Sequence, residues 1–337
     1  MTTERAQEPA VAPDTGGDVL TFGETMVALR GSGPLKLGGS MEVSIAGAES
    51  NVAIGLSRLG HPVRWVGTVG DDEAGELVLR TLRAEGVDVT GVQHDASAPT
   101  GLILFEPRLP DVTRVHYYRA ASAGSRLEPN AIERAFAARA PRILHLTGIT
   151  PALSSSALAA ARRALELGRA HGSLICLDVN FRSRLWSAEA ASAFLDVCVP
   201  HVDVLIASDD ELPLCLPQGG APSDSTADVA ALAKLLLARG VGEVVVKLGP
   251  EGAVSHTAHG EFHRPARPVR AVDSVGAGDA FVAGYLSALL DGEDTSARLD
   301  RAVTTGAFAV ASPGDWEGAP TRSELGLLGS RAGTVVR

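Results

Sequence analysis

Short apolar runs alternate with longer amphipathic segments along the second half of the chain. The runs have the length of strands, and the segments repeat their apolar positions at helical spacing. The predicted strands are 143–146, 174–178, 204–207 and 243–248, and the predicted helices are 154–171, 188–198, 209–216 and 227–239. Repeated strand–helix units predict a parallel sheet that is covered by helices on both faces. We therefore expect an α/β fold.

The first half of the chain starts in the same way and then changes. A strand at 18–24 is followed by elements that again alternate, with helices at 51–59 and 74–85 around a strand at 63–67. Residues 100–105 and 113–119 flank a polar turn and predict a β-hairpin. Residues 29–44 are rich in glycine with short apolar alternation, which indicates strands or loops outside the main sheet.

Composition narrows the class of protein. Hydrophobic residues make up 45% of the 337 residues, and the formal net charge is -10, which disfavours nucleic acid as a partner. The three cysteines are widely spaced and form no metal-binding pattern, so reduced, buried thiols are expected. The N-terminus has no signal-peptide pattern and no apolar run is long enough to span a membrane. We expect a cytoplasmic protein with a disordered tail at 1–17, one domain at 18–326 and a C-terminal tail at 327–337.

Polar residues collect where the predicted strands end. They lie at 178–182, 208–211 and 247–252. Ligands of open α/β sheets bind at the carboxyl ends of the strands, so these segments predict one cleft.

A glycine-containing stretch, 273–281, carries the clearest candidate chemistry. A strand-like run at 268–272 precedes it and an apolar, helix-forming run at 280–290 follows it, so Gly276 and Gly278 stand at a helix start. A helix start offers unpaired N–H groups to an anion, and glycine lets that backbone approach a ligand. Asp279 adds a carboxylate, and the two together suit phosphoryl transfer to a hydroxyl. The alternative is a glycine-rich loop in which Asp279 only caps the helix.

Two common nucleotide motifs are absent from the sequence. There is no Gly-x-x-x-x-Gly-Lys-Ser/Thr loop, and no dinucleotide fingerprint follows the first strand. These absences disfavour P-loop enzymes and nicotinamide-dependent oxidoreductases.

The stretch at 273–281 resembles the second signature of the ribokinase-like (phosphofructokinase-B) carbohydrate kinases. Residues 46–60, which begin Ala-Gly-Ala-Glu-Ser-Asn, resemble the first signature of that family. The resemblance extends from about residue 19 to residue 325. It implies a three-layer fold with a mostly parallel central sheet, and a small β-sheet lid formed by 35–45 and 100–119.

Further segments resemble the 2-keto-3-deoxygluconate kinases within that family. They are Tyr117-Tyr118-Arg119, residues 144–153, residues 177–187 and residues 314–320. The resemblance implies transfer of the γ-phosphate of ATP, with Mg²⁺, to a primary hydroxyl of this sugar acid. Two arginines suit a carboxylate better than a neutral sugar. Ile103 stands where the subgroup often has a tyrosine.

Roles for single residues follow from the resemblance. Asp279 is the expected catalytic base, and the backbone of Gly276, Ala277 and Gly278 is the expected anion hole. The expected substrate-binding residues are Gly47, Asn51, Tyr117, Arg119, Arg182 and Asp315. ATP is expected to contact Ser208, Lys247, Gly249, Gly252, Gly276 and Gly278, and Glu211 to act on Mg²⁺ through water. Some family members also bind a monovalent cation, for which Asp273 is a candidate ligand.

The residues themselves leave other interpretations open. Lys247 also fits a solvated strand end, Glu211 an acidic helix start, and Tyr117 with Arg119 a solvated edge strand. For the whole chain, the alternatives are a kinase for fructose or a related keto-deoxy sugar acid, and a non-catalytic sugar-binding regulatory protein. The family resemblance also implies a homo-oligomer.

Overall fold

The computed structural model describes residues 18–109, 112–217 and 228–329. The predicted N-terminal tail, 1–17, lies outside these residues. Residues 327–329 of the predicted C-terminal tail belong to a 3₁₀ helix, η7 (Arg322–Gly329). Residues 330–337 lie outside the described part.

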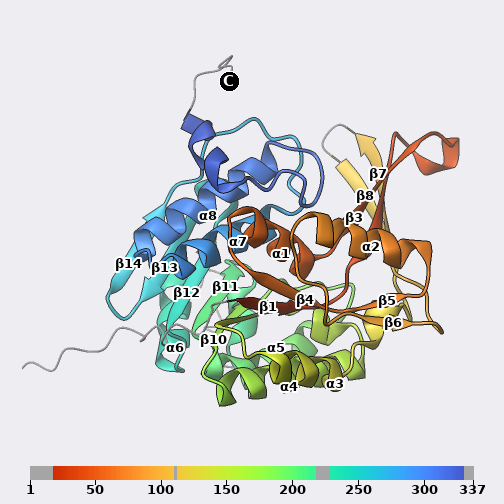
Figure 1. Cartoon of the computed structure of the whole chain (residues 1–337). Helices are drawn as coiled ribbons and strands as arrows, with labels where there is room; N and C mark the ends of the chain where they lie inside the picture. The colour runs from red at the N-terminus through yellow and green to blue at the C-terminus, as the bar shows by residue number, and fades with distance from the viewer. Residues whose placement is uncertain (1–17, 110–111, 218–227, 330–337) are drawn as a thin grey trace, which may run out of the picture.

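An eight-stranded sheet forms the centre of the molecule (Figure 1). Its strand order is β14-β13-β12-β11-β10-β9-β1-β4. The six strands from β12 to β4 are parallel, and β13 pairs antiparallel with both β12 and β14. The strands are β1 (Val19–Phe22), β4 (Val63–Val66), β9 (Ile143–Thr147), β10 (Leu174–Asp178), β11 (Val204–Ser208), β12 (Glu243–Lys247), β13 (Ala253–Thr257) and β14 (Gly260–Arg264). The predicted parallel sheet is confirmed.

Helices cover both faces of this sheet, as the alternation of strands and helices predicted (Figure 1). One layer contains α3 (Pro129–Ala138), α4 (Ser155–Ala170), α5 (Ala188–Cys198) and α6 (Val229–Ala238). The other contains α1 (Ala48–Arg58), α2 (Glu73–Ala84), α7 (Ala277–Leu290) and α8 (Thr295–Val310). Several helices start where the sequence supplies a cap: Ser154 and Asp294 each accept a hydrogen bond from a backbone N–H of the first turn.

A second, four-stranded sheet stands beside the main one, and we call it the small sheet (Figure 1). Its order is β3-β2-β7-β8, formed by β2 (Met26–Gly31), β3 (Met41–Ala46), β7 (Leu102–Leu109) and β8 (Val112–Tyr118). The predicted hairpin forms, but its first strand includes residues 106–109, which were predicted as part of the turn. β2 was not predicted as part of this sheet, and residues 35–37 form a short 3₁₀ helix, η1 (Leu35–Leu37), rather than a strand. Two further strands, β5 (Thr68–Gly70) and β6 (Gln93–Asp95), pair with each other.

Two other predictions about single elements were wrong. Residues 268–272 form no strand, although Val272 donates its N–H to the carbonyl of Val310 at the end of α8. The helix predicted at 209–216 is a 3₁₀ turn, η5 (Leu212–Cys215), because its prolines leave no room for a longer α-helix.

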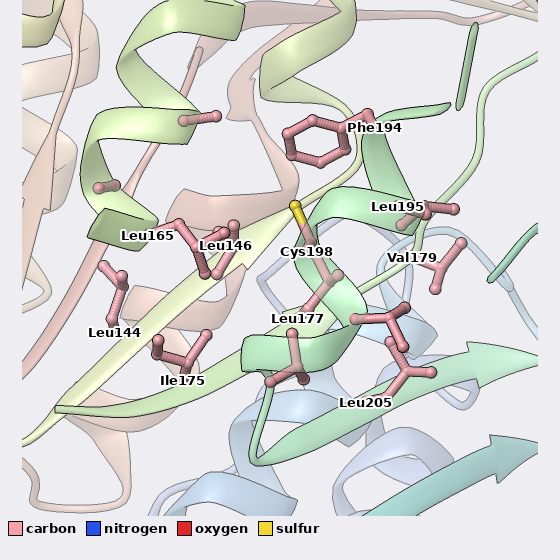
Figure 2. Close-up of a cluster of buried hydrophobic side chains, with 14 of the residues drawn as sticks. Leu144, Leu146, Leu165, Ile175, Leu177, Val179, Phe194, Leu195, Cys198 and Leu205 are labelled. Atoms are coloured by element: carbon pink, nitrogen blue, oxygen red, sulfur yellow. The ribbon is translucent and has the colours of Figure 1, made fainter. Parts of the chain in front are cut away.

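The core between the main sheet and the α3–α6 layer is filled by apolar side chains (Figure 2). Leu144, Leu146, Ile175 and Leu177 of the strands face this layer, and Phe194 of α5 packs over them. The cysteines are buried free thiols, as expected, and Cys198 belongs to this cluster. None of the helices in the described part of the chain is long and apolar enough to span a membrane.

Removing the ring of Phe194 will destabilise this core. Phe194 is 2% exposed, so Phe194→Ala will lower the free energy of unfolding by about 3–5 kcal/mol through lost contacts and a cavity. Val197 lies on the same helix but is 50% exposed, so Val197→Ala will change the free energy by less than about 0.5 kcal/mol. Urea unfolding of the two variants measures both values. If both variants lose the same free energy of unfolding, the ring of Phe194 contributes no more to this core than an exposed side chain does.

Candidate active site

A cleft of about 1530 Å³ lies at the carboxyl ends of the parallel strands and extends to the small sheet. The sequence predicted a single cleft at this edge, and the strand ends meet there. Most of the predicted site residues line it: Gly47, Asn51, Tyr117, Arg119, Arg182, Ser208, Glu211, Lys247, Gly276, Gly278, Asp279 and Asp315. Ala277, Gly249 and Gly252 are not among the lining residues.

The N-terminus of α7 opens into this cleft. Gly276 precedes the helix with φ of 73°, in the left-handed region, and a Cβ on it would lie 1.8 Å from the carbonyl oxygen of Asp315. No side chain caps the helix. The free N–H groups and the helix dipole therefore favour an anion at this point. A Cβ on Gly278 would meet only the ammonium group of Lys247, at 3.8 Å, so a cation lies beside the helix start.

Asp279 lies in the first turn of α7 and is buried. Its Oδ2 accepts a hydrogen bond of 2.8 Å from Nδ2 of Asn51 on α1. The carboxylate therefore does not cap its own helix, and the capping interpretation was wrong. Burial raises the pKa of Asp279 to about 7, against the lowering effect of the Asn51 hydrogen bond. A carboxylate with this pKa suits a general base near neutral pH.

Lys247 ends β12 and donates a 2.8 Å hydrogen bond to Oδ1 of Asp178, at the end of β10. Burial alone lowers the pKa of Lys247, but the Asp178 and Glu211 carboxylates outweigh it and raise that pKa. The side chain is 19% exposed, so Lys247 is not a solvated strand end. A permanent positive charge beside Gly278 is available to a phosphate.

Glu211 joins the loops that follow two neighbouring strands. Its Oε1 accepts a hydrogen bond of 2.7 Å from the N–H of Phe181, and its Oε2 one of 2.8 Å from the N–H of Ser208. The carboxylate is thereby fixed in the wall of the cleft. It keeps lone pairs for a metal-bound water, so this residue fits the water-mediated role expected near Mg²⁺.

The two predicted arginines differ in their surroundings. Arg119 pairs with the buried carboxylate of Glu24 at 2.5 Å and lies 5.7 Å from the ring centroid of Tyr117. The contact confirms that Tyr117 and Arg119 share one face. Arg182 also lines the cleft, and its guanidinium has no hydrogen-bond or ion-pair partner within the described residues. Arg182 is therefore the cation that is freer to meet an anionic ligand.

The substrate-binding prediction for Asp315 meets a different arrangement. Asp315 is buried and pairs with Arg30 at 2.7 Å, and Arg30 also pairs with Asp273 at 3.0 Å. Burial raises the pKa of Asp315 to about 6. Asp273, the candidate ligand of a monovalent cation, thus already has a cationic partner.

Residues 17–322 match the family described as "pfkB family carbohydrate kinase". The chain belongs to this family. Two relatives are 36% identical to the chain and are both named 2-dehydro-3-deoxygluconokinase: that of Bacillus subtilis strain 168 covers 94% of this chain and 97% of its own length, and that of Thermoproteus tenax covers 95% of each. A solved E. coli protein, provisionally named ribokinase II and in complex with ATP and Mg²⁺, has a TM-score of 0.84 and 25% identity over 93% of this chain and 98% of its own.

The family assignment makes this PfkB protein a phosphotransferase that acts on a sugar hydroxyl. It also confirms the ribokinase-like fold and supports ATP with Mg²⁺ as the phosphoryl-donor system. The described residues fit that system, because the uncapped start of α7 and Lys247 suit phosphates and Glu211 suits a hydrated Mg²⁺.

Residues of this kinase that sequence analysis missed are mostly the partners of predicted ones. Glu24 lies just after β1 and holds Arg119, and Arg30 on β2 holds Asp273 and Asp315. The buried carboxylate of Glu49 accepts hydrogen bonds from Thr147 and Thr150 and also lines the cleft. Glu24 follows a predicted strand end, so the strand-end rule was a usable signal for it; Arg30 gave no such signal.

The activity of this kinase will depend on pH through Asp279. Asp279 is the candidate base and must be unprotonated to act, and its pKa is about 7, so we expect kcat/KM for the sugar to fall as the pH drops through about 7. The Asn51 hydrogen bond lowers that pKa, so in Asn51→Ala the fall will begin at higher pH. The control is Asn130→Ala, an exposed asparagine on α3. An acid limb that is unchanged in Asn51→Ala would contradict this role of Asn51.

Proposed function

We propose that this PfkB kinase transfers the γ-phosphate of ATP to a primary hydroxyl of 2-keto-3-deoxygluconate, which is also named 2-dehydro-3-deoxygluconate. The observation that carries the proposal is a buried carboxylate, Asp279, in the first turn of an uncapped helix whose start lines the same cleft as Arg182. The guanidinium of Arg182 has no partner among the residues that the structure describes. The names of the two relatives at 36% identity support the choice of sugar acid.

The proposed reaction uses the groups in the cleft as follows. Asp279 accepts the proton of the sugar hydroxyl, whose oxygen attacks the γ-phosphorus while the bond to the ADP oxygen breaks. The N–H groups at Gly276 and Gly278, together with Lys247, balance the charge of the transferring group, whereas the N–H of Ala277 already donates to the carbonyl of Ser274 at 3.3 Å. Mg²⁺, when bound, would neutralise charge on the phosphates, and Glu211 would hold one of its waters.

The remaining site roles are proposals on the same footing. Arg182 binds the sugar-acid carboxylate, and Arg119 with Tyr117 forms the wall opposite the helix start. Gly47 and Asn51 face the sugar at the start of α1, and Asp315 approaches its hydroxyls. Ser208 contacts the nucleotide. Gly249 and Gly252 lie in the turn between β12 and β13, and we assign them to the part of ATP that lies beyond the lined cleft.

The small sheet exposes apolar side chains, including Val43, Val112 and Tyr118. We infer that this surface is covered in a homo-oligomer, and sedimentation velocity would test the inference.

The donor is ATP and the cysteines are free thiols, so we infer a cytoplasmic enzyme. Fractionation of cells would test this localisation.

Arg30 already balances the charge of Asp273. We therefore infer that a monovalent cation, if one is used, is not held by this carboxylate. The potassium dependence of the activity of Asp273→Asn tests the inference.

A kinase for fructose or for another keto-deoxy sugar acid is the second candidate. Ile103 lies opposite Tyr117 across β7 and β8 and lines the cleft, so this wall offers no hydrogen-bonding side chain at that point. A panel of the sugar acid, its epimers and fructose, with ADP release as readout, decides between the candidates. If no sugar of the panel causes release of ADP, the result argues for a regulatory sugar-binding protein.

Replacing the proposed base removes turnover but not nucleotide binding. Asp279→Asn keeps the shape and the contact with Asn51, so we expect kcat to fall at least about 100-fold while the Kd for ATP changes less than about threefold. Coupled ADP release and calorimetric titration measure the two quantities. Turnover of Asp279→Asn close to that of the parent would rule out Asp279 as the base.

The carboxylate of the sugar acid distinguishes the two arginines. Arg182→Ala loses one charged hydrogen bond to the sugar acid, which costs about 1.5–3 kcal/mol of transition-state stabilisation. We therefore expect kcat/KM to fall roughly 10- to 150-fold for the sugar acid and much less for fructose. Arg119→Ala leaves the buried carboxylate of Glu24 with its hydrogen bond from Ser122 but without its cation, so we expect similar losses of kcat/KM for both substrates. The ratio of kcat/KM for the two sugars is the measurement. A ratio that changes more in Arg119→Ala would assign the carboxylate to Arg119 instead.

A further inference from the structure

One residue of the small sheet reaches the catalytic end of the main domain. Arg30 lies in β2, opposite Phe105 in β7, and its guanidinium carbon lies 4.2 Å from the centroid of that ring. The aromatic face supports the planar cation from one side. The direction of Arg30 is therefore set by the small sheet itself.

The other end of this side chain is shared by two carboxylates. Nη1 donates to Oδ2 of Asp273 at 3.0 Å, and Nη2 donates to Oδ2 of Asp315 at 2.7 Å. The Arg30 side chain is 18% exposed and that of Asp315 is 7% exposed, so the pairs are poorly screened by water. Without the guanidinium, the two carboxylates would face each other and repel.

Both carboxylates belong to segments that shape the start of α7. Oδ1 of Asp273 accepts a hydrogen bond of 3.0 Å from the N–H of Val275, which fixes the turn before Gly276. The carbonyl of Asp315 fills the place where Gly276 would carry a side chain. The anion hole is thus bounded by two segments that Arg30 ties together.

A second hydrogen bond also connects the small sheet with the segment that contains Asp315. Ser44 of β3 donates a hydrogen bond of 2.5 Å to Oε1 of Glu317, two residues after Asp315. Arg58 of α1 donates to the carbonyls of Glu317 and Ala319 at 3.0 and 2.7 Å. The segment at 315–319 is therefore held between the small sheet and α1.

We propose that Arg30 is a positioning residue, which brings the start of α7 into its anion-binding geometry only while the small sheet is seated over the cleft. This inference rests on the proposed phosphoryl transfer at Asp279, but not on which sugar is the acceptor. It links enclosure of the sugar by the small sheet to stabilisation of the transferring phosphoryl group. When no sugar holds the small sheet in place, the start of α7 does not reach this geometry, so the rate of phosphoryl transfer to water is lower.

The test compares Arg30→Gln and Arg30→Ala with Arg108→Gln, which removes the same charge from an exposed position on β7 of the same sheet. We expect kcat to fall roughly 10- to 100-fold in both Arg30 variants, because small displacements at a reacting centre cost this much, while KM for the sugar changes less than about threefold. Millimolar guanidinium ion will restore part of the activity of Arg30→Ala. Arg108→Gln will keep the kcat of the parent.

Hydrogen exchange supplies a readout that needs no turnover. Exchange of the N–H groups in residues 272–281 will speed up in Arg30→Gln and not in Arg108→Gln. Normal kcat in Arg30→Gln, unchanged exchange, or an equal loss of kcat in Arg108→Gln overturns the proposal. All variants are assayed with a sugar that the parent phosphorylates, so rejection of the sugar acid by the parent defeats only the proposed substrate. If the parent phosphorylates no sugar, the exchange result alone decides the role of Arg30.

Discussion

The contact between α1 and α7 is the constraint on which the rest of the site depends. Asn51 reaches Asp279 only because the two helices pack closely: a Cβ on Gly55 would lie 2.6 Å from the Cβ of Ala283. A larger residue at Gly55 would separate the helices and break the hydrogen bond that joins the two family signatures. The start of α7, where we propose that the anion binds, and the amide that holds the proposed base are therefore fixed by one packing distance.

The charges around Asp279 explain why its carboxylate can serve as a base at neutral pH. Burial strongly disfavours the charged form, and Asp178 adds to that effect. Asn51, Arg182 and Lys247 act in the opposite direction, so the pKa settles at about 7 rather than higher. Lys247 is itself kept charged by Asp178, so the same ion pair supplies a phosphate partner and limits its influence on the base. The balance is a property of the meeting strand ends, not of one residue.

Sequence analysis predicted the parts of this site that depend on local patterns. The alternation of strands and helices placed the ends of β10, β11 and β12 at one edge, and the glycines at 276 and 278 indicated the helix start. It did not predict contacts made across long sequence separations. Arg30 meets Asp273 from 243 residues away and Glu24 meets Arg119 from 95 residues away, and neither spacing carries a periodic signal. The short strands β13 and β14 were missed for a related reason, since their apolar positions are few and their pairing is what defines them.

The arginines around the cleft are not equivalent, because those on the side of the small sheet have carboxylate partners and Arg182 does not have one in the described chain. Arg119, near the small sheet, is neutralised by Glu24, and Arg30 is neutralised by Asp273 and Asp315, so the cations from that side are committed to holding the structure together. Arg182 lies on the exposed loop that follows β10 of the main sheet, and it has no such partner in the described chain. A cation that is already paired gains little from a ligand carboxylate, because binding would have to replace an interaction of the same kind. We therefore propose that an anionic substrate meets Arg182 at the carboxyl edge of the main sheet, while the small sheet contributes walls and the seating of the helix start.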